Sequence, residues 1–186
     1  LNSFVKSYII SKVSKVIMSR PGVSGVTLNI GGDIVVAGNR QELIQVSNPL
    51  ADAENDQSVS TLNISNKAVA TSGNYRRGFE IGDQWFSHIL DARTAIPAKE
   101  IISATVVAER ATDAGALATA FNILSPEESY MLARQTPGAE YLIITKTGQH
   151  IQSSGWAALQ VSTPKDVQNT SVSKGGRGDF ELVIEI

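Results

Sequence analysis

Apolar residues recur every three or four positions near the beginning of the chain, which is the spacing of one face of an α-helix. The positions are Val5, Tyr8, Ile9, Val13, Val16 and Ile17. Lysines lie on the other side of this stripe, and such a stripe normally faces the core. The spacing predicts an amphipathic helix that ends at Pro21-Gly22.

Alternation of apolar and polar residues, the period of a β-strand, follows in several short segments. Residues 23–30 and 34–37 flank Gly31-Gly32-Asp33 and predict a hairpin, and on spacing alone this turn is interpreted as structural. Further strands are expected at 43–46, 60–64, 67–71, 102–108, 140–145 and 150–153.

Two more helices are expected between these strands. Thr112 or Asp113 can cap a helix over residues 114–124. Ser125-Pro126-Glu127-Glu128 is a second helix start, because serine caps, proline suits the first turn and acids favour the positive end. This helix is expected to end near Thr136-Pro137-Gly138. Helices packed on an antiparallel sheet define a mixed α+β fold class.

The composition changes at residue 157, after which Ser, Thr, Gln, Asn and Gly dominate. We therefore expect a domain over residues 1–156, a linker over 157–178, and a strand over 179–186 that begins a further domain.

Bulk composition excludes several classes of protein. A net charge of -2 gives no reason to expect binding to nucleic acid, for which a basic stripe would be the sign. The chain has no cysteine, which excludes disulfides and thiolate metal sites. No apolar run approaches the ~20 residues that span a bilayer.

The stretch from Val69 to Thr94 has the most varied chemistry. It contains His88, one of two histidines, whose unperturbed pKa of about 6.5 suits an acid or base near neutrality. Asp91 can orient it and Arg93 can meet a phosphate. The alternative is that His88 is an ordinary turn residue, and His150 is interpreted as structural.

Other polar groups suggest an anion site and a metal site. Asn74, Arg76 and Arg77 follow Ser72-Gly73 and can cradle an anion, although a solvated hairpin tip is the alternative. Lys6 can reach a phosphate from its helix, although a solvated helix lysine is the alternative. Asp113 and Thr119 straddle a helix start, but one carboxylate is little for Mg²⁺.

Together these pieces resemble the ApbE family of flavin transferases, which move FMN from FAD to a serine or threonine of a target protein. The resemblance covers most of residues 1 to about 156. Its segments are 1–12, Asn29-x-Gly31-Gly32-Asp33, Thr71-Ser72-Gly73-Asn74-Tyr75, Ser87-His88-Ile89-x-Asp91-x-Arg93-Thr94 and 113–124. It implies an ApbE-like mixed or antiparallel sheet with packed helices, as the C-terminal part of an incomplete domain.

The resemblance also implies residue roles. His88 would activate the acceptor hydroxyl, and Mg²⁺ would be bound by the carbonyl of Ser3, by Asp113 and by Thr119. The implied flavin contacts are Lys6, Ser87, His88, Asp91, Arg93, Thr94, Asn74 and Arg76. FAD is then the substrate and Mg²⁺ the metal.

Some positions depart from the family pattern. Ser7 and Ser11 replace a glycine and an acid, and the metal-binding acid four residues before Thr119 is Gly115. Asp113 would serve only from a loop before the helix, because on a helix it lies roughly 200° from position 115. These changes favour, as the alternative, an impaired domain that holds a flavin nucleotide or a partner. A domain that binds no nucleotide is the third interpretation.

The resemblance finally implies a partner and a place. The acceptor would be a protein with a flavinylation site, such as a subunit of a redox-driven pump or a flavoprotein reductase. The location would be periplasmic or membrane-anchored on the outer side of the inner membrane, with a lipid anchor ahead of Leu1.

Overall fold

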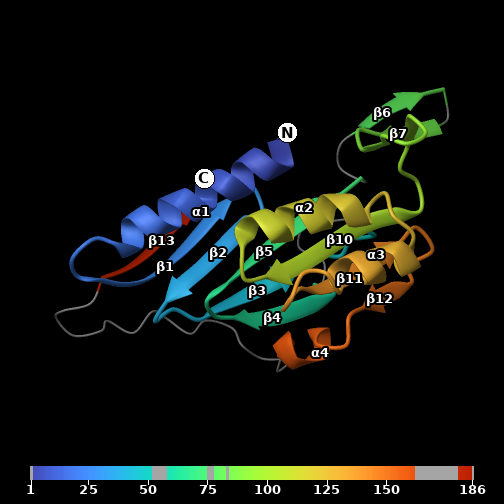
Figure 1. Ribbon diagram of the computed structural model, residues 1–186. Coiled ribbons are helices and arrows are strands. Elements are labelled where there is room, and N and C mark those ends of the chain that lie inside the picture. The colour runs from blue at the N-terminus through green and yellow to red at the C-terminus, as the bar shows by residue number, and fades with distance from the viewer. Residues whose placement is uncertain (1, 52–57, 75–77, 83, 162–179, 186) are drawn as a thin grey trace.

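The computed structural model describes residues 2–51, 58–74, 78–82, 84–161 and 180–185, and its centre is a seven-stranded sheet (Figure 1). Neighbouring strands are antiparallel except for the last pair, β1 and β13. The order is β12 (His150–Gln152), β11 (Glu140–Thr145), β10 (Ile101–Ala108), β5 (Lys67–Gly73), β2 (Asp33–Gly38), β1 (Val23–Ile30) and β13 (Phe180–Glu185).

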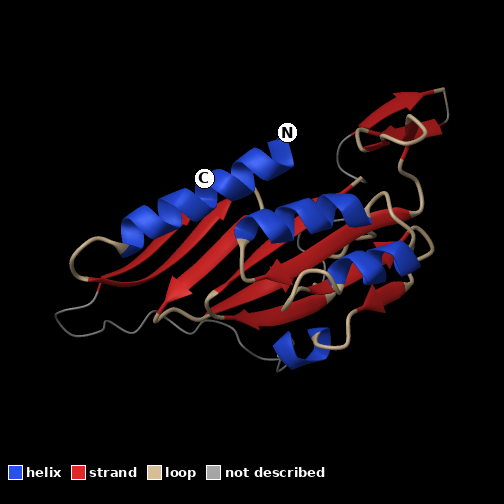
Figure 2. Cartoon of the chain, viewed as in Figure 1, coloured by secondary structure: helices blue, strands red, loops and turns tan. Residues whose placement is uncertain are grey.

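Helices cover one face of this sheet, and a hairpin with a short helix covers the other (Figures 1 and 2). The first face carries α1 (Asn2–Met18), α2 (Ala111–Phe121) and α3 (Pro126–Ala133). The second carries β3 (Glu42–Val46), β4 (Ser60–Ile64) and α4 (Trp156–Leu159). The expected α+β class is confirmed.

Two apolar cores result, one on each face. Because side chains alternate along a strand, Val106 of β10 joins the core under α1 and α2, whereas Val107 joins the core that contains Trp156. Both valines and Trp156 are 0% exposed.

The helix α1 turns a different face to the sheet from the one that the sequence predicts. Ser7, Ile10 and Ser14 are buried against the fold. The predicted inner face is largely exposed, with Tyr8 and Val16 at 48% and 53%. The prediction was wrong because α1 is apolar around most of its circumference, and small serines let a helix approach a sheet closely. The exposed apolar residues of α1 are Phe4, Val5, Tyr8, Ile9, Val13 and Val16.

The two helix starts that the sequence predicts have different outcomes. α2 begins at Ala111 after Arg110, with no side-chain cap, so the expected capping by Thr112 or Asp113 was wrong. At α3 the Ser125 side chain accepts from the Glu128 amide, and the Glu128 side chain accepts from the Ser125 amide. This capping box confirms the predicted helix start.

The C-terminal region does not test the expected division into domains. α4 occupies the first residues of the expected linker, and most of that linker lies outside the described residues. The expected strand over 179–186 is present as β13, but it pairs with β1 in the main sheet. That it begins a further domain stays a prediction.

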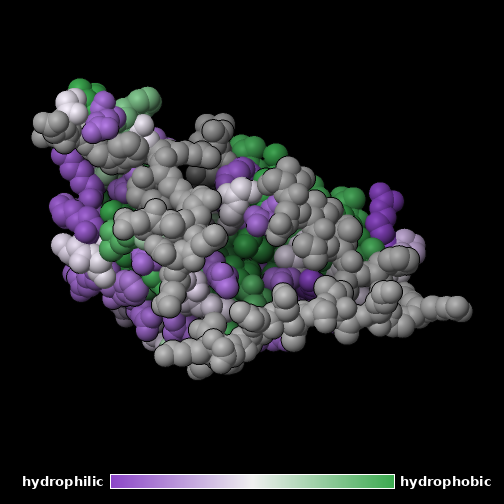
Figure 3. All heavy atoms as spheres, turned by 180° about the vertical axis from the view of Figure 1, so that it is seen from behind, coloured by the Kyte–Doolittle hydropathy of each residue, from purple (hydrophilic) through white to green (hydrophobic). Residues whose placement is uncertain are grey.

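A hairpin of β6 (Gly78–Ile81) and β7 (Gln84–Ser87) stands away from the sheet, in a stretch where no strand was expected (Figure 1). Phe79 and Ile81 on it are 72% and 67% exposed, and Figure 3 shows apolar side chains on this projection at upper left. Among the described residues, no helix is long and apolar enough to cross a membrane.

Candidate functional site

Most of the predicted site residues gather at one end of the sheet. α1 begins there, the β1–β2 turn lies there, and α2 ends there beside α1 (Figure 1). β5 also ends there and leads toward the β6–β7 hairpin. The strand order, rather than sequence proximity, therefore brings these segments together.

The first group of side chains joins α1 to the β1–β2 turn, and we call Lys6, Ser7 and Asp33 the helix cluster. Lys6 Nζ lies 3.0 Å from Asp33 Oδ1 and 3.4 Å from the Gly31 carbonyl oxygen. Ser7 Oγ donates to Asp33 Oδ2 at 2.8 Å. Asp33 has a side chain only 8% exposed, while that of Lys6 is 40% exposed. Lys6 is thus held by a buried carboxylate and still reaches solvent.

The turn inside this group depends on two glycines. Gly31 and Gly32 have φ values of 55° and 89°, which residues other than glycine rarely adopt. The amide of Gly32 donates to Asn29 Oδ1 at 3.1 Å. The turn is therefore fixed locally, and it presents Asp33 to α1.

His88 lies in a bend between β7 and β8 (Leu90–Asp91), and its side chain is exposed. Its neighbours Ser87 and Ile89 are buried, at 6% and 7%. Ser87 Oγ accepts from the Ile89 amide at 3.0 Å, and the Ala98 amide donates to the Ile89 carbonyl at 2.8 Å. Anchored neighbours thus present the imidazole at the surface, and its catalytic role stays a prediction.

Asn74 has a bracing role that the sequence does not predict. It is 5% exposed, and its side-chain nitrogen donates to the carbonyls of Ala98 and Ile101 at 3.2 and 2.7 Å. Both amide hydrogens are therefore used within the protein, and this nitrogen offers no donor to a flavin. Arg76 and Arg77, predicted beside it, lie outside the described residues.

A second charged group, the turn cluster, consists of Asp91, Arg93 and Glu128. Arg93 lies 3.0 Å from Asp91 Oδ2 and 3.0 Å from Glu128 Oε1. Hydrogen bonds from Arg93 lower the pKa of Asp91. The pKa of Glu128 is lowered by the hydrogen bond from the Ser125 backbone and then by Arg93. Glu128 was predicted only as an acid at the start of a helix, and its pairing with Arg93 was not expected.

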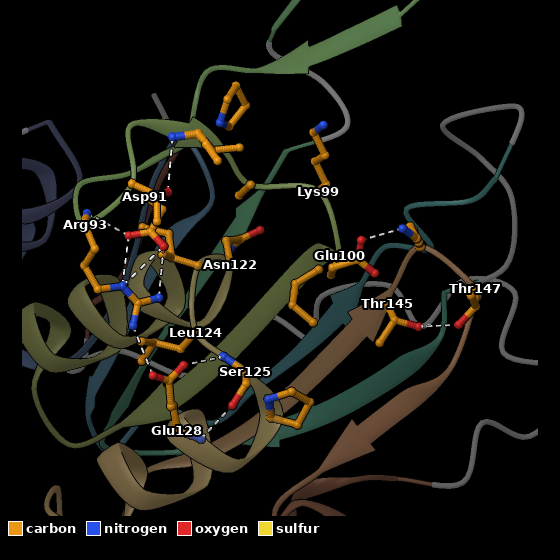
Figure 4. A pocket seen from close by; sticks show the side chains of 18 of the residues that line it. Asp91, Arg93, Lys99, Glu100, Asn122, Leu124, Ser125, Glu128, Thr145 and Thr147 are labelled. Atoms are coloured by element: carbon orange, nitrogen blue, oxygen red, sulfur yellow. Dashed lines mark hydrogen bonds and ion pairs between the residues drawn. The ribbon is translucent and has the colours of Figure 1, made fainter.

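The turn cluster borders a cavity of about 710 Å³, which we call the turn pocket (Figure 4). Its walls come from residues 91–101, including β9 (Ile96–Pro97), from 122–128 and from 145–149. Figure 4 shows Lys99 and Glu100 across the pocket from Arg93. Thr94 also lines the pocket, and its hydroxyl accepts from the Ile96 amide at 3.3 Å.

The predicted metal ligands lie on two helices, Ser3 on α1 and Asp113 and Thr119 on α2. Asp113 is the third residue of α2 rather than a loop residue, and it pairs with Arg110 at 3.6 Å. Asp113 and Thr119 are six residues apart on α2, so they lie about 9 Å apart along the helix axis and about 120° apart around it. Thr119 Oγ donates to the Gly115 carbonyl at 3.0 Å. Ser3 lies in the first turn of α1, with its side chain outside the described part.

The described residues contain no group of three or more His, Cys, Asp or Glu that could hold a metal. Mg²⁺ prefers carboxylate oxygens, and Gly115 supplies none beside Thr119. The helix begins three residues earlier than expected, so Asp113 lies on α2 and not in the loop from which it was expected to reach the metal. Its role as a metal ligand stays a prediction.

The known proteins that this chain resembles are ApbE proteins and FAD:protein FMN transferases. A family model described as the ApbE family matches residues 1–143. The chain is 28% identical over 152 residues to an FAD:protein FMN transferase of Klebsiella pneumoniae, covering 79% of this chain and 42% of that protein. It is 29% identical over 149 residues to the protein of that name in Escherichia coli K12, covering 77% and 41%.

Solved structures are similar as well. An ApbE protein of Thermotoga maritima matches with a TM-score of 0.75 and 27% identity, covering 86% of this chain and 52% of that one. The apo flavinyl transferase ApbE of Pseudomonas stutzeri matches with a TM-score of 0.68, and its 24% identity supports the fold alone. The chain thus spans about two fifths of these curated relatives and about half of these structures.

Proposed function

Because the chain belongs to the ApbE family, we propose that it is part of an FAD:protein FMN transferase. The observation that carries the proposal is the presentation of His88, exposed between two buried neighbours in a loop that is anchored to the β9–β10 connection. The relatives named FAD:protein FMN transferase align with more than three quarters of this chain, which supports the same class.

In the proposed reaction, a serine or threonine hydroxyl of the acceptor attacks the FMN phosphorus of FAD. A new oxygen–phosphorus bond forms, the pyrophosphate bond breaks, and AMP leaves. His88 would take the proton of the hydroxyl, since an imidazole can act as a base near neutral pH. Lys6 would meet the negative charge of the nucleotide from the helix cluster, where its amine still reaches solvent.

The test compares two histidine variants of the protein that contains this chain. His88→Ala should slow covalent FMN attachment to an acceptor protein by about 100-fold or more, measured as flavin fluorescence in a denaturing gel. His150→Ala is the matched control, since His150 is the other histidine and is exposed on β12. A wild-type rate in His88→Ala would overturn the assigned role.

The proposal extends to the acceptor protein and the cellular location. The acceptor is a protein with an accessible serine or threonine, such as a redox-pump subunit or a flavoprotein reductase. The location is periplasmic or membrane-anchored on the outer side of the inner membrane, as the family resemblance implies.

A second candidate function is a domain that binds a flavin nucleotide but does not transfer it. It is favoured by Gly115, which leaves Thr119 without a neighbouring carboxylate on α2. The family resemblance implies a transferase that depends on Mg²⁺, whereas this binding domain would hold FAD without it, so the two candidates differ in magnesium dependence.

Titration with FAD, with and without Mg²⁺, separates the two candidates. FAD binding that does not depend on Mg²⁺, together with no transfer, supports the binding domain. In that case Gly115→Asp should make FAD binding respond to Mg²⁺, because it restores a carboxylate one helical turn from Thr119. Gly115→Asn controls for the added volume, as Gly115 is buried.

A further inference from the structure

We propose that the turn pocket binds an extended segment of the acceptor polypeptide and leads it toward His88. The inference rests on the proposed function. Only part of this cavity is lined by residues with a predicted flavin role, and none of it by the predicted metal ligands. Its walls come from three separate segments of the chain, and its size is in the range of small-ligand sites.

The charges of the pocket suit a polypeptide better than a nucleotide. Its lining contains as many carboxylates as cations, and most of the cations are already paired. Arg93 is held by Asp91 and Glu128, and Lys146 by Glu100. The lining as a whole therefore has no net positive charge, so it attracts a pyrophosphate only weakly. The apolar part of the lining is Ile96, Pro97, Ile101, Ile123, Leu124 and Pro126.

Asn122 provides an independent sign of a missing partner. It lines the pocket and is 2% exposed. Its side-chain nitrogen donates to the carbonyls of Ser72 and Ala118 at 3.0 and 2.9 Å, and this fixes which end of the amide is oxygen. Its Oδ1 has no hydrogen-bond partner among the described residues. A buried carbonyl of this kind calls for a donor, and a peptide N–H or a hydroxyl is one.

Lys99 sets the charge of the segment that fits. Unlike Arg93 and Lys146, it has no ion-pair partner in the described part of the chain. It is exposed on the side of the pocket opposite Arg93 (Figure 4). An acidic residue near the acceptor's serine or threonine would pair with it.

The pocket also adjoins the residue proposed to act on the acceptor hydroxyl. The Ala98 amide, in the pocket wall, donates to the carbonyl of Ile89, the residue next to His88. Asp91 and Arg93, three and five residues beyond His88, form the facing wall. A segment that lies in the pocket is thus next to the His88 loop.

The experiment is a titration of the isotope-labelled chain followed by amide chemical shifts. The first probe is an acetylated, amidated alanine hexapeptide with one threonine and one aspartate, and the second has asparagine in place of the aspartate. The aspartate peptide should shift the amides of residues 122–126 and 145–149. Lys99→Glu should weaken its binding about fivefold and leave the asparagine peptide unaffected.

Lys15→Glu is the matched control, since it makes the same charge change at an exposed position of α1 and should alter neither titration. Separate titration with FAD distinguishes the two proposals. Absence of peptide shifts in the turn pocket overturns this one, as does displacement of the peptide by FAD. If FAD does not bind at a site outside the turn pocket, that result counts against the proposed function and not against peptide binding.

Discussion

The helix cluster and the turn cluster contain similar ion pairs at similar distances, yet water reaches them differently. Lys6–Asp33 and Arg93–Asp91 are both 3.0 Å long. The Asp33 and Lys6 side chains are 8% and 40% exposed, whereas those of Asp91, Arg93 and Glu128 are 17%, 55% and 48% exposed. Water screens an exposed pair, and a buried carboxylate must be satisfied by its protein partners. The first cluster therefore stabilises the fold, and the second mainly orients a loop.

The largest expected effect is at Asp33. Asp33→Ala removes the partner of Lys6 and the acceptor of the Ser7 hydroxyl, and it should lower the free energy of unfolding by about 2 kcal/mol. The loss should not be larger, because water partly screens the exposed Lys6 amine. Urea denaturation measures the change. Asp33→Asn keeps an oxygen acceptor and should lose less, so an equal loss in both variants would contradict this account.

A smaller loss is expected at the capping box beside the turn cluster. Ser125→Ala removes the oxygen that accepts from the Glu128 amide and should cost about 1 kcal/mol in urea denaturation. Ser125→Thr keeps a hydroxyl and serves as the control. If both variants lose the same stability, the side chain is not acting as a cap.

The substitution Arg93→Ala should cost less again. It removes exposed ion pairs with Asp91 and Glu128 and leaves the capping hydrogen bonds of α3 in place. The denaturation midpoint should move less than in Ser125→Ala, while the peptide binding expected in the turn pocket weakens. A midpoint shift as large as that of Asp33→Ala would remove the distinction between the two clusters.

The smallest effect is a dependence on pH. Hydrogen bonds from Arg93 hold the pKa of Asp91 below its ordinary value of 3.8, and they help to hold that of Glu128 below 4.5. A carboxyl whose pKa is lowered by folding stabilises the fold above its unfolded pKa and loses that effect as pH falls through the folded pKa. The stability difference between wild type and Arg93→Ala should be full above about pH 4.5 and shrink below about pH 3.8. A difference that grows on acidification would reverse the assigned sign.

Local patterns predicted the strands better than they predicted contacts. The strands at 23–30, 60–64 and 140–145 have the predicted limits, because alternation records a local requirement of the backbone. The start of α3 was predictable for the same reason, since its capping box lies within four residues.

The errors come from interactions between distant segments. Which face of α1 packs on the sheet depends on how closely the helix approaches the sheet. The spacing of its apolar residues does not show this. The β6–β7 hairpin is a local exception, because its two strands are neighbours in sequence and no strand was predicted for either. In the site, Glu128 was missed because its partner Arg93 is 35 residues away.

The outward face of α1 has a consequence for handling this chain. Six large apolar side chains on that face are 38–55% exposed, while two serines occupy the buried face. Sulfate salts strengthen apolar association because they are excluded from protein surfaces. In ammonium sulfate, the chain should therefore bind to a phenyl column more strongly than its average hydropathy implies. A Tyr8→Lys, Ile9→Lys variant should elute earlier without losing secondary structure.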